Sequence, residues 1–164
     1  MAEDLSIDIE KLVGDKIEKG VVGSTLILEN RKLGDESVSQ LSNLEVLSEV
    51  ITLDLGENNI SDTGVHTLVN SPYIENLKTL NLKSNNLTEE GAKFIAESPK
   101  LKDLEHLILK FNRIGEAGAN YLAQSETLTN LRTLDLFRNR IGDAGVKAIK
   151  KSKNFRGVSR MRLD

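Results

Sequence analysis

The sequence of 164 residues contains no cysteine and no tryptophan, and only two prolines, four phenylalanines and two tyrosines. Without cysteine there is neither a disulfide framework nor a thiolate metal site, and a reducing compartment such as the cytoplasm is favoured. No apolar run approaches the roughly 18 residues of a membrane-spanning helix. The first residues, Met1-Ala2-Glu3-Asp4, lack the basic segment of a secretion signal. We therefore expect a soluble protein without a conventional signal peptide.

The small net charge of the chain is the difference between two halves of opposite sign. The formal net charge is −3. Residues 1–82 carry fifteen acidic and six basic groups, whereas residues 83–164 carry ten acidic and sixteen basic groups. Two interpretations stay open for this asymmetry: ordinary variation among solvated faces, or a field that steers a charged partner.

A motif that returns every 27 residues organises most of the chain. Its four clearest copies follow the pattern Leu-x-x-Leu-x-Leu-x-x-Asn-x-Ile and begin at Val50, Leu77, Leu104 and Leu131. A degenerate copy begins at residue 23, and a partial copy begins at Val158. A strict period of this length indicates a one-dimensional stack in which each unit contacts mainly its neighbours. We predict one array over residues 23–164, made of five 27-residue units and a terminal strand.

Each unit combines a strand with a short helix. In the segment Leu77–Leu82, apolar and polar residues alternate, which is the period of a strand with one buried face. In the second half of the same unit, Ala92 and Ile95 have the spacing of a buried helix face, and Thr88 precedes them as a helix cap. The glycine that occurs once per repeat, such as Gly91, is expected at a turn.

These residues resemble the ribonuclease-inhibitor-like class of leucine-rich repeats. Its consensus continues with Gly-Ala-x-x-Leu-Ala and is matched closely from Val50 to Lys151. The second part of the consensus is also similar to the repeats of certain bacterial effector proteins. The resemblance implies an α/β fold, a right-handed solenoid with a parallel sheet of six strands on its concave side and helices on its convex side. It implies no single function, because inhibitors, GTPase activators, immune sensors and effectors share this scaffold.

The resemblance also gives the repeated asparagine a structural role. In this class its side-chain amide satisfies backbone groups of neighbouring turns, as an amide that both donates and accepts can do. We expect a structural ladder formed by Asn58, Asn85, Asn112 and Asn139. A bacterial effector would be translocated into a host cell without a conventional signal peptide, so this destination stands beside the cytoplasm.

Residues 1–22 lie outside the repeat register. Ile9, Leu12, Val13 and Ile17 have nearly helical spacing among charged residues. We predict an amphipathic N-terminal cap over the first unit, with a detachable partner-binding helix as the alternative. The terminal strand has no comparable cap after it in the sequence. Because an exposed strand edge can pair with another chain, we expect either a monomer or a weak end-to-end dimer through this strand.

The concave face of units four and five is the predicted binding surface. Ile108, Phe111 and Phe137 are apolar at positions that the repeat exposes, and basic residues surround them. Aromatic anchors ringed by cations have the composition of a protein-binding hot spot. The candidate partner-binding residues are His106, Ile108, Lys110, Phe111, Asp135, Phe137, Arg138, Arg160 and Arg162. Phe94 and Tyr121 form a second, convex candidate, and packing under the turn remains an alternative for the two concave phenylalanines.

No constellation of residues indicates an enzyme, a cofactor or a metal site. His66 and His106 lie in different units without an acidic partner at ligand spacing. Two alternatives to protein binding stay open. Arg31, at the asparagine position of the first unit, would fit a GTPase activator, because the Ran GTPase-activating protein resembles this class. A nucleic-acid binder could use Phe111 and Phe137 as stacking platforms, together with the basic residues Lys83, Lys110, Arg138, Arg160 and Arg162.

Overall fold

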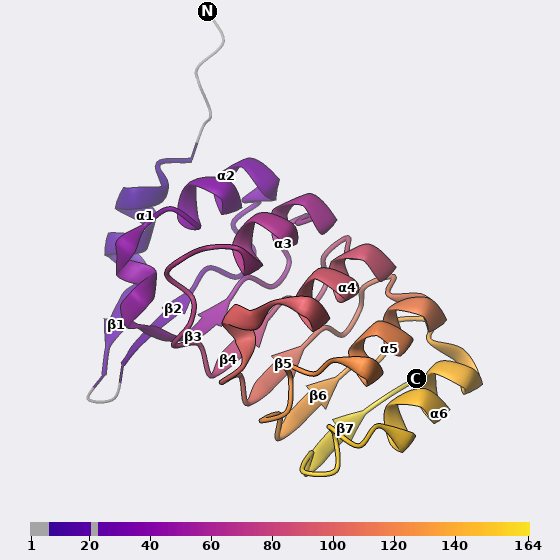
Figure 1. The fold of residues 1–164 in the computed structure, drawn as a ribbon. Coiled ribbons are helices and arrows are strands. Elements are labelled where there is room, and N and C mark those ends of the chain that lie inside the picture. Colours follow the sequence, from indigo (N-terminus) through magenta and orange to yellow (C-terminus); the bar gives the residue numbers. More distant parts are fainter. Residues whose placement is uncertain (1–6, 21–22) are drawn as a thin grey trace, which may run out of the picture.

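The computed structural model describes residues 7–20 and 23–164. It contains one seven-stranded sheet and a series of helices (Figure 1). In chain order the elements are α1 (Ile9–Lys16), β1 (Ile17–Lys19), β2 (Ser24–Ile27), α2 (Gly34–Leu41), β3 (Val50–Asp54), α3 (Asp62–Val69), β4 (Thr79–Asn81), α4 (Glu89–Glu97), β5 (His106–Ile108), α5 (Gly115–Gln124), β6 (Thr133–Asp135), α6 (Gly142–Lys151) and β7 (Arg160–Arg162). Two short 3-10 helices, Glu45–Glu49 and Pro99–Leu101, lie in the returning loops.

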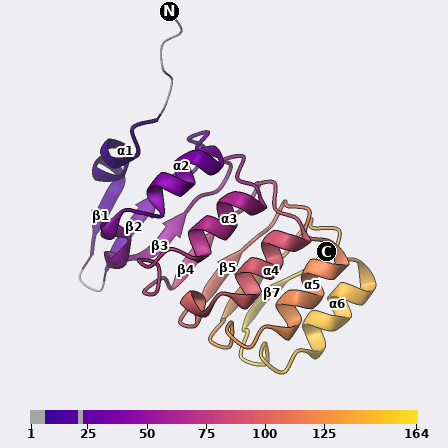
Figure 2. The same ribbon diagram turned by 45° about the horizontal axis from the view of Figure 1, so that its top comes forward.

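Strands β2 to β7 are parallel and follow one another in chain order. From β3 to β6 each strand leucine lies directly beside its counterpart 27 residues later, in the series Leu53, Leu80, Leu107 and Leu134. Helices α2 to α6 lie side by side on one side of the sheet (Figures 1 and 2). The predicted α/β solenoid, with a parallel sheet and a layer of helices, is confirmed.

The core fills the space between the sheet and the helices. The strand leucines, the isoleucines after the asparagines and the inner helix residues are buried in one continuous cluster. The residues that return the chain to the next strand, Ile74, Leu101, Leu128 and Phe155, are buried too. No helix in the described part of the chain is long and apolar enough to cross a membrane.

The sheet has one strand more than the six predicted. Strand β1 pairs antiparallel with β2, with Ile17 beside Leu26 and Lys19 beside Ser24. The segment Ile17–Lys19 lies outside the 27-residue register, so the repeat pattern cannot indicate this strand. Helix α1 precedes it and buries Ile9 and Val13. Of the residues 1–22 to which the predicted cap was assigned, 1–6 and 21–22 lie outside the described residues.

The prediction that the once-per-repeat glycines lie at turns is wrong. Gly64, Gly91, Gly118 and Gly145 lie inside the first turns of the helices and are buried. A methyl group on Gly118 would overlap Ile114 and would lie 3.1 Å from Ala92 Cβ of the preceding repeat. These glycines are therefore required for close packing of successive repeats. The turn glycines are Gly34, Gly115 and Gly142, whose φ values are 62°, 66° and 62°.

Side-chain capping distinguishes helices α3 and α4 from the other repeat helices. Ser61 and Thr88 accept hydrogen bonds from the backbone N–H groups of Thr63 and Glu90, so the predicted cap at Thr88 is confirmed. Helices α2, α5 and α6 begin at glycine and have no side-chain cap. Glycine supplies the left-handed turn there without a side-chain hydrogen bond.

Candidate functional site

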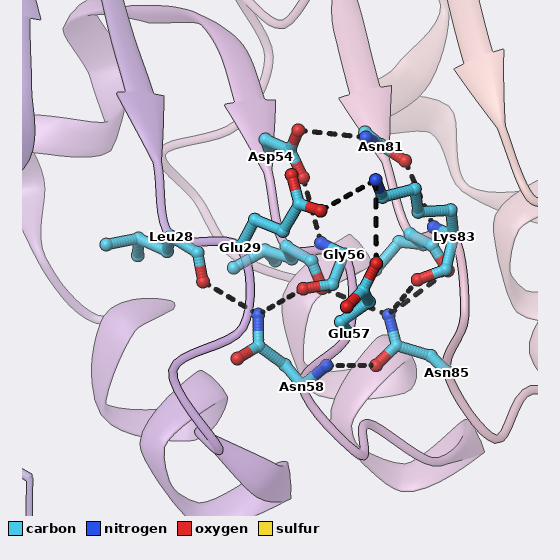
Figure 3. Close-up of polar contacts among 11 residues, drawn as sticks. Leu28, Glu29, Asp54, Gly56, Glu57, Asn58, Asn81, Lys83 and Asn85 are labelled. Atoms are coloured by element: carbon cyan, nitrogen blue, oxygen red, sulfur yellow. Dashed lines mark hydrogen bonds and ion pairs between the residues drawn. The ribbon is translucent and has the colours of Figure 1, made fainter.

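The ladder asparagines are buried and bind the backbone of neighbouring repeats (Figure 3). Asn85 Nδ2 donates to the carbonyl of Leu55 in the preceding repeat, at 3.0 Å, and to that of Leu82 in its own, at 3.1 Å. Its Oδ1 accepts from the backbone N–H groups of Asn58 and Ile60, both at 3.0 Å. Its Nδ2 also donates to the carbonyl of Lys83 at 3.3 Å, so one side chain bonds to five backbone groups around the turn after the strand.

The asparagine ladder extends along the array. Asn58, Asn112 and Asn139 make corresponding donor contacts to carbonyls of their own and the preceding repeat. In the last turn the Asp164 carboxylate accepts from the N–H groups of Asn139 and Ile141, at 2.9 and 2.6 Å. The Asp164 carboxylate thus accepts from the two N–H groups in the same way as the Oδ1 of Asn85 accepts from Asn58 and Ile60. The turns after each strand are fixed by these bonds, and they hold the side chains that face the concave side.

In the first half of the concave face, one lysine forms ion pairs with two glutamates. Lys83 Nζ lies 2.6 Å from Glu29 and 3.7 Å from Glu57, and the three residues come from successive repeats (Figure 3). The hydrogen bond from Lys83 and its positive charge lower the pKa of Glu29, and the same contact raises the pKa of Lys83. Asn81 Nδ2 also donates to Asp54, at 2.9 Å.

In the second half, the predicted strand residues lie next to one another. Strand register places His106 between Thr79 and Thr133, and Ile108 between Asn81 and Asp135. The His106 ring lies 3.0 Å from the Thr133 hydroxyl, through Nδ1. Ile108 is half-buried in a column whose neighbours are polar. Histidine and isoleucine thus form the edge of the surface nearest the acidic half.

Asp135 has a structural partner inside the chain. Its Oδ1 accepts the backbone N–H of Phe137 at 3.1 Å, as Asp54 accepts that of Gly56 at 2.9 Å. Short acidic side chains commonly close turns in this way. This bond positions the phenylalanine that follows, so Asp135 contributes to the candidate site through Phe137.

Phe111 and Phe137 form an aromatic pair on the surface. Their ring centroids are 5.8 Å apart and their planes meet at 82°, an edge-to-face arrangement. Phe137 is half-buried, whereas Phe111 is 43% exposed. The alternative prediction, in which both phenylalanines pack under the turn, is wrong for Phe111.

The backbone at Phe111 is left-handed, with φ of 60°. The equivalent residue of each other repeat is also left-handed, in the series Asn30, Glu57, Ser84 and Arg138. Glycine and asparagine adopt this conformation at little cost, but for a bulky residue it is unfavourable by about 1 to 2 kcal/mol. The turn therefore demands the conformation, and phenylalanine is a poor residue for it.

Two arginines lie over the rings of this aromatic pair. The guanidinium carbon of Arg162 lies 4.1 Å from the centroid of the Phe137 ring. That of Arg138 lies 5.5 Å from the Phe137 centroid and 5.8 Å from the Phe111 centroid. Lys110 Nζ lies 5.9 Å from the Phe111 centroid. We call Phe111, Phe137, Arg138 and Arg162 the aromatic-arginine cluster.

The cluster borders an open hollow of about 730 Å³. The hollow is lined by Phe111, Phe137 and Arg138 from the cluster and by Asn85, Asn112, Arg113, Arg140 and Asp164. The residues predicted from sequence did not include Arg113 and Arg140, which each follow a ladder asparagine directly. The repeat register could have identified them, because this position changes from asparagine (Asn59 and Asn86) in the earlier units to arginine in the later ones.

Within the described part of the chain, no arginine of this region has an acidic partner. Ion pairs there involve Lys78, Lys83, Lys100 and Arg132, but none involves Arg113, Arg138, Arg140, Arg160 or Arg162. No guanidinium N–H of these five residues donates a hydrogen bond to another described residue. The second half of the concave face therefore presents cations whose donors are free, in contrast to Lys83 in the first half.

The other sequence candidates are distributed elsewhere. Arg160 is exposed on β7, beside Thr133. On the convex side the ring centroids of His66 and Phe94 are 4.5 Å apart, and Lys93 Nζ lies 5.5 Å from the Tyr121 ring centroid. Arg31 is exposed in the first turn. Among the described residues no group of three or more histidine, aspartate and glutamate side chains is arranged to hold a metal ion.

Comparison with protein families agrees with the repeat geometry. A family model described as the leucine-rich repeat matches residues 50–69, 73–96, 100–123 and 127–150, which together make up more than half of the chain. The chain belongs to the leucine-rich repeat family. Repeats of this family generally mediate protein–protein interactions, and the family is typically non-enzymatic. The comparison with curated proteins gave no match.

Proposed function

We propose that this leucine-rich repeat protein is a non-enzymatic module that binds another protein through the second half of its concave face. The observation that carries the proposal is the aromatic-arginine cluster, in which arginines without acidic partners lie over the exposed Phe111 and the half-buried Phe137. Aromatic and arginine side chains are the residues that dominate binding energy in protein interfaces. The first half of the concave face provides less, because its lysine, Lys83, is already paired with Glu29 and Glu57.

The properties of Phe111 support a role outside folding. The residue combines a left-handed backbone with a largely exposed aromatic ring, and both are unfavourable for a surface position. Ser84 occupies the equivalent position of unit three with φ of 52°. Serine therefore fits this turn, and it exposes no aromatic ring. Unfavourable local features that the surrounding structure sustains are typical of binding sites.

Affinity capture followed by mass spectrometry tests this proposal. The bait proteins are the wild type, a Phe111→Ser, Phe137→Ala double variant, and Tyr121→Ala. Serine is the residue of the equivalent turn in unit three, and Tyr121 is an exposed aromatic residue on the convex helix α5. Bacterial and eukaryotic lysates are both used, because a bacterial cytoplasmic protein and an effector translocated into a host cell would meet different partners.

We expect a protein that the wild type and Tyr121→Ala retain and that the double variant loses. Circular dichroism checks that all three baits are folded. Equal retention by the folded double variant would place the binding surface elsewhere. Loss of the protein with Tyr121→Ala alone would transfer the site to the convex helices.

A further inference from the structure

We infer that the aromatic-arginine cluster binds an extended acidic segment of its partner, with carboxylates on the arginines and an apolar side chain on the phenylalanines. The inference rests on the proposed function and adds the chemistry of the partner to it. It follows from the geometry of the two stacked arginines, from the charges around them and from the spacing of the strands.

The stacking leaves the hydrogen-bond donors of the arginines available. The Arg162 guanidinium lies 4.1 Å from the Phe137 ring centroid, and the Arg138 guanidinium lies within 6 Å of both ring centroids. A guanidinium over a ring is held by a cation–π attraction that uses none of its N–H donors as hydrogen bonds to an acceptor. Such a group is positioned before binding and matches the two oxygens of a carboxylate.

Among the described residues, the nearby carboxylates form no ion pair with these arginines. Asp135 accepts the backbone N–H of Phe137, and both oxygens of Asp164 accept backbone N–H groups in the last turn. Lys110, Arg113 and Arg140 add positive charge around the cluster. The surface consequently has an excess of positive charge, and an acidic ligand completes the hydrogen bonds that the chain leaves open.

The arrangement of the strands fits an extended segment. The cluster and its basic neighbours come from the turns after β5 and β6 and from β7 itself, which are adjacent strands. Adjacent strands lie about 4.8 Å apart, so the three strands span about 10 Å. In an extended segment, side chains on the same face recur about every 6.7 Å. A segment of about five residues, with the pattern acidic-x-apolar-x-acidic, covers this distance.

The first half of the concave face argues against a nucleic-acid strand. Glu29, Asp54 and Glu57 lie there, and the one lysine among them, Lys83, is paired with Glu29 and Glu57. A long phosphate backbone that continued along the sheet would meet these carboxylates and be repelled. A short acidic peptide needs only the second half. Lys83 therefore does not join the basic surface that the sequence assigned to a nucleic-acid binder.

A selection from random peptides tests the inference. Twelve-residue peptides displayed on phage are selected on the folded wild-type protein, with the Arg138→Gln, Arg162→Gln double variant used for counter-selection. We expect enrichment of aspartate and glutamate next to an apolar residue. Enrichment of basic or purely apolar peptides would overturn the inference, and so would the absence of any enriched peptide.

Binding measurements on the most enriched peptide then separate the contributions. Fluorescence anisotropy compares this peptide with a twin in which asparagine and glutamine replace its acidic residues, and with a twelve-nucleotide oligothymidylate. We expect the amide twin to bind roughly 10-fold or more weakly, because hydrogen bonds to charged groups are stronger. Arg138→Lys should lose part of the affinity although it keeps the charge, because lysine lacks the planar fork. Lys147→Gln, an exposed change on helix α6, is the matched control and should bind normally.

The outcomes distinguish this inference from the proposed function. If the captured protein depends on Phe111 and Phe137 but the arginine double variant binds it normally, protein binding stands and the acidic segment is wrong. Equal binding of the amide twin would likewise exclude the acidic segment and leave protein binding intact. Tighter binding of the oligonucleotide than of any peptide, with loss in the arginine variant, would replace both proposals by nucleic-acid binding. If the lysate partner is lost only in convex variants, both proposals fail together.

Discussion

Replacing Asn112 with alanine tests the ladder that fixes the concave turns. Asn112 Nδ2 donates to the carbonyls of Leu82 and Leu109, both at 2.9 Å, and its Oδ1 accepts from the N–H of Leu87 at 3.1 Å. Each carbonyl keeps one other donor after the change, from Asn85 and Asn139 respectively. The Leu87 N–H, in contrast, is left without a side-chain acceptor among the described residues.

The cost can be worked out from these three bonds. A buried donor left without a partner costs about 1 to 3 kcal/mol, and each of the two lost carbonyl bonds costs about 0.5 to 1.5 kcal/mol. We therefore expect Asn112→Ala to lower the free energy of unfolding by about 2 to 6 kcal/mol. Urea denaturation followed by circular dichroism measures it, since the chain has no tryptophan. Asn120→Ala, which loses one exposed bond within helix α5, is the control and should cost little.

A double variant makes the same reasoning sharper. Asn85 and Asn112 share the Leu82 carbonyl, so removing both leaves it without either side-chain donor. We expect Asn85→Ala and Asn112→Ala together to cost more than the sum of the single changes. Asn58 and Asn112 share no acceptor, so the losses of stability from Asn58→Ala and Asn112→Ala should be additive. Additive losses for the first pair, or a loss below about 1 kcal/mol for Asn112→Ala alone, would refute the ladder as a source of stability.

Two further predictions concern packing and charge. Gly118→Ala should lower the free energy of unfolding, measured by urea denaturation, by about 1 to 3 kcal/mol, because the added methyl group meets Ile114 and Ala92. In the control Gly14→Ala, on helix α1, the methyl group meets nothing within 4 Å and should stabilise the protein. Equal effects of the two changes would contradict the close packing of repeats. Lys83→Met should remove the pH dependence that the pair with Glu29 gives to unfolding. The pKa of Glu29 is lowered in the folded state, so the contribution is present above its usual pKa of 4.5 and is lost as pH falls through the lowered value. The pKa of Lys83 is raised, so the contribution is present below its usual pKa of 10.5 and is lost as pH rises through the raised value. The stability difference between wild type and Lys83→Met, measured from pH 3 upward, should be under about 1 kcal/mol and largest between these limits, and a difference that grows in acid would be the contrary result.

The 27-residue period made most of the fold predictable. Leucines at fixed intervals must occupy the same layer of the stack, and the register of Leu53, Leu80 and Leu107 follows from that. Strand β1 could not be predicted in this way, because it belongs to no repeat and pairs through its backbone. The helix glycines were misassigned because a glycine needed for close packing and a glycine needed for a turn look the same in sequence.

The position of the candidate site could be predicted from the sequence, but not all of its residues and contacts could. An apolar residue at an exposed repeat position is visible in sequence, and Phe111 was found in that way. The stacking of Arg138 and Arg162 depends on side-chain conformations that no repeat pattern contains. Lys83 and Glu29 are 54 positions apart in the sequence, so their ion pair could not be predicted. Lys83 was therefore counted among the basic residues of a possible nucleic-acid-binding surface.

Site-specific photocross-linking tests directly whether a protein partner binds the concave face. The photoreactive residue p-benzoylphenylalanine replaces Phe111 in one protein and Tyr121 in another, so that the same group lies on the concave or the convex side. Both proteins are irradiated in a lysate from which the wild type captures a partner. We expect the partner to cross-link to position 111 and not to position 121. A cross-link from position 121 without one from position 111 would contradict binding through the concave face.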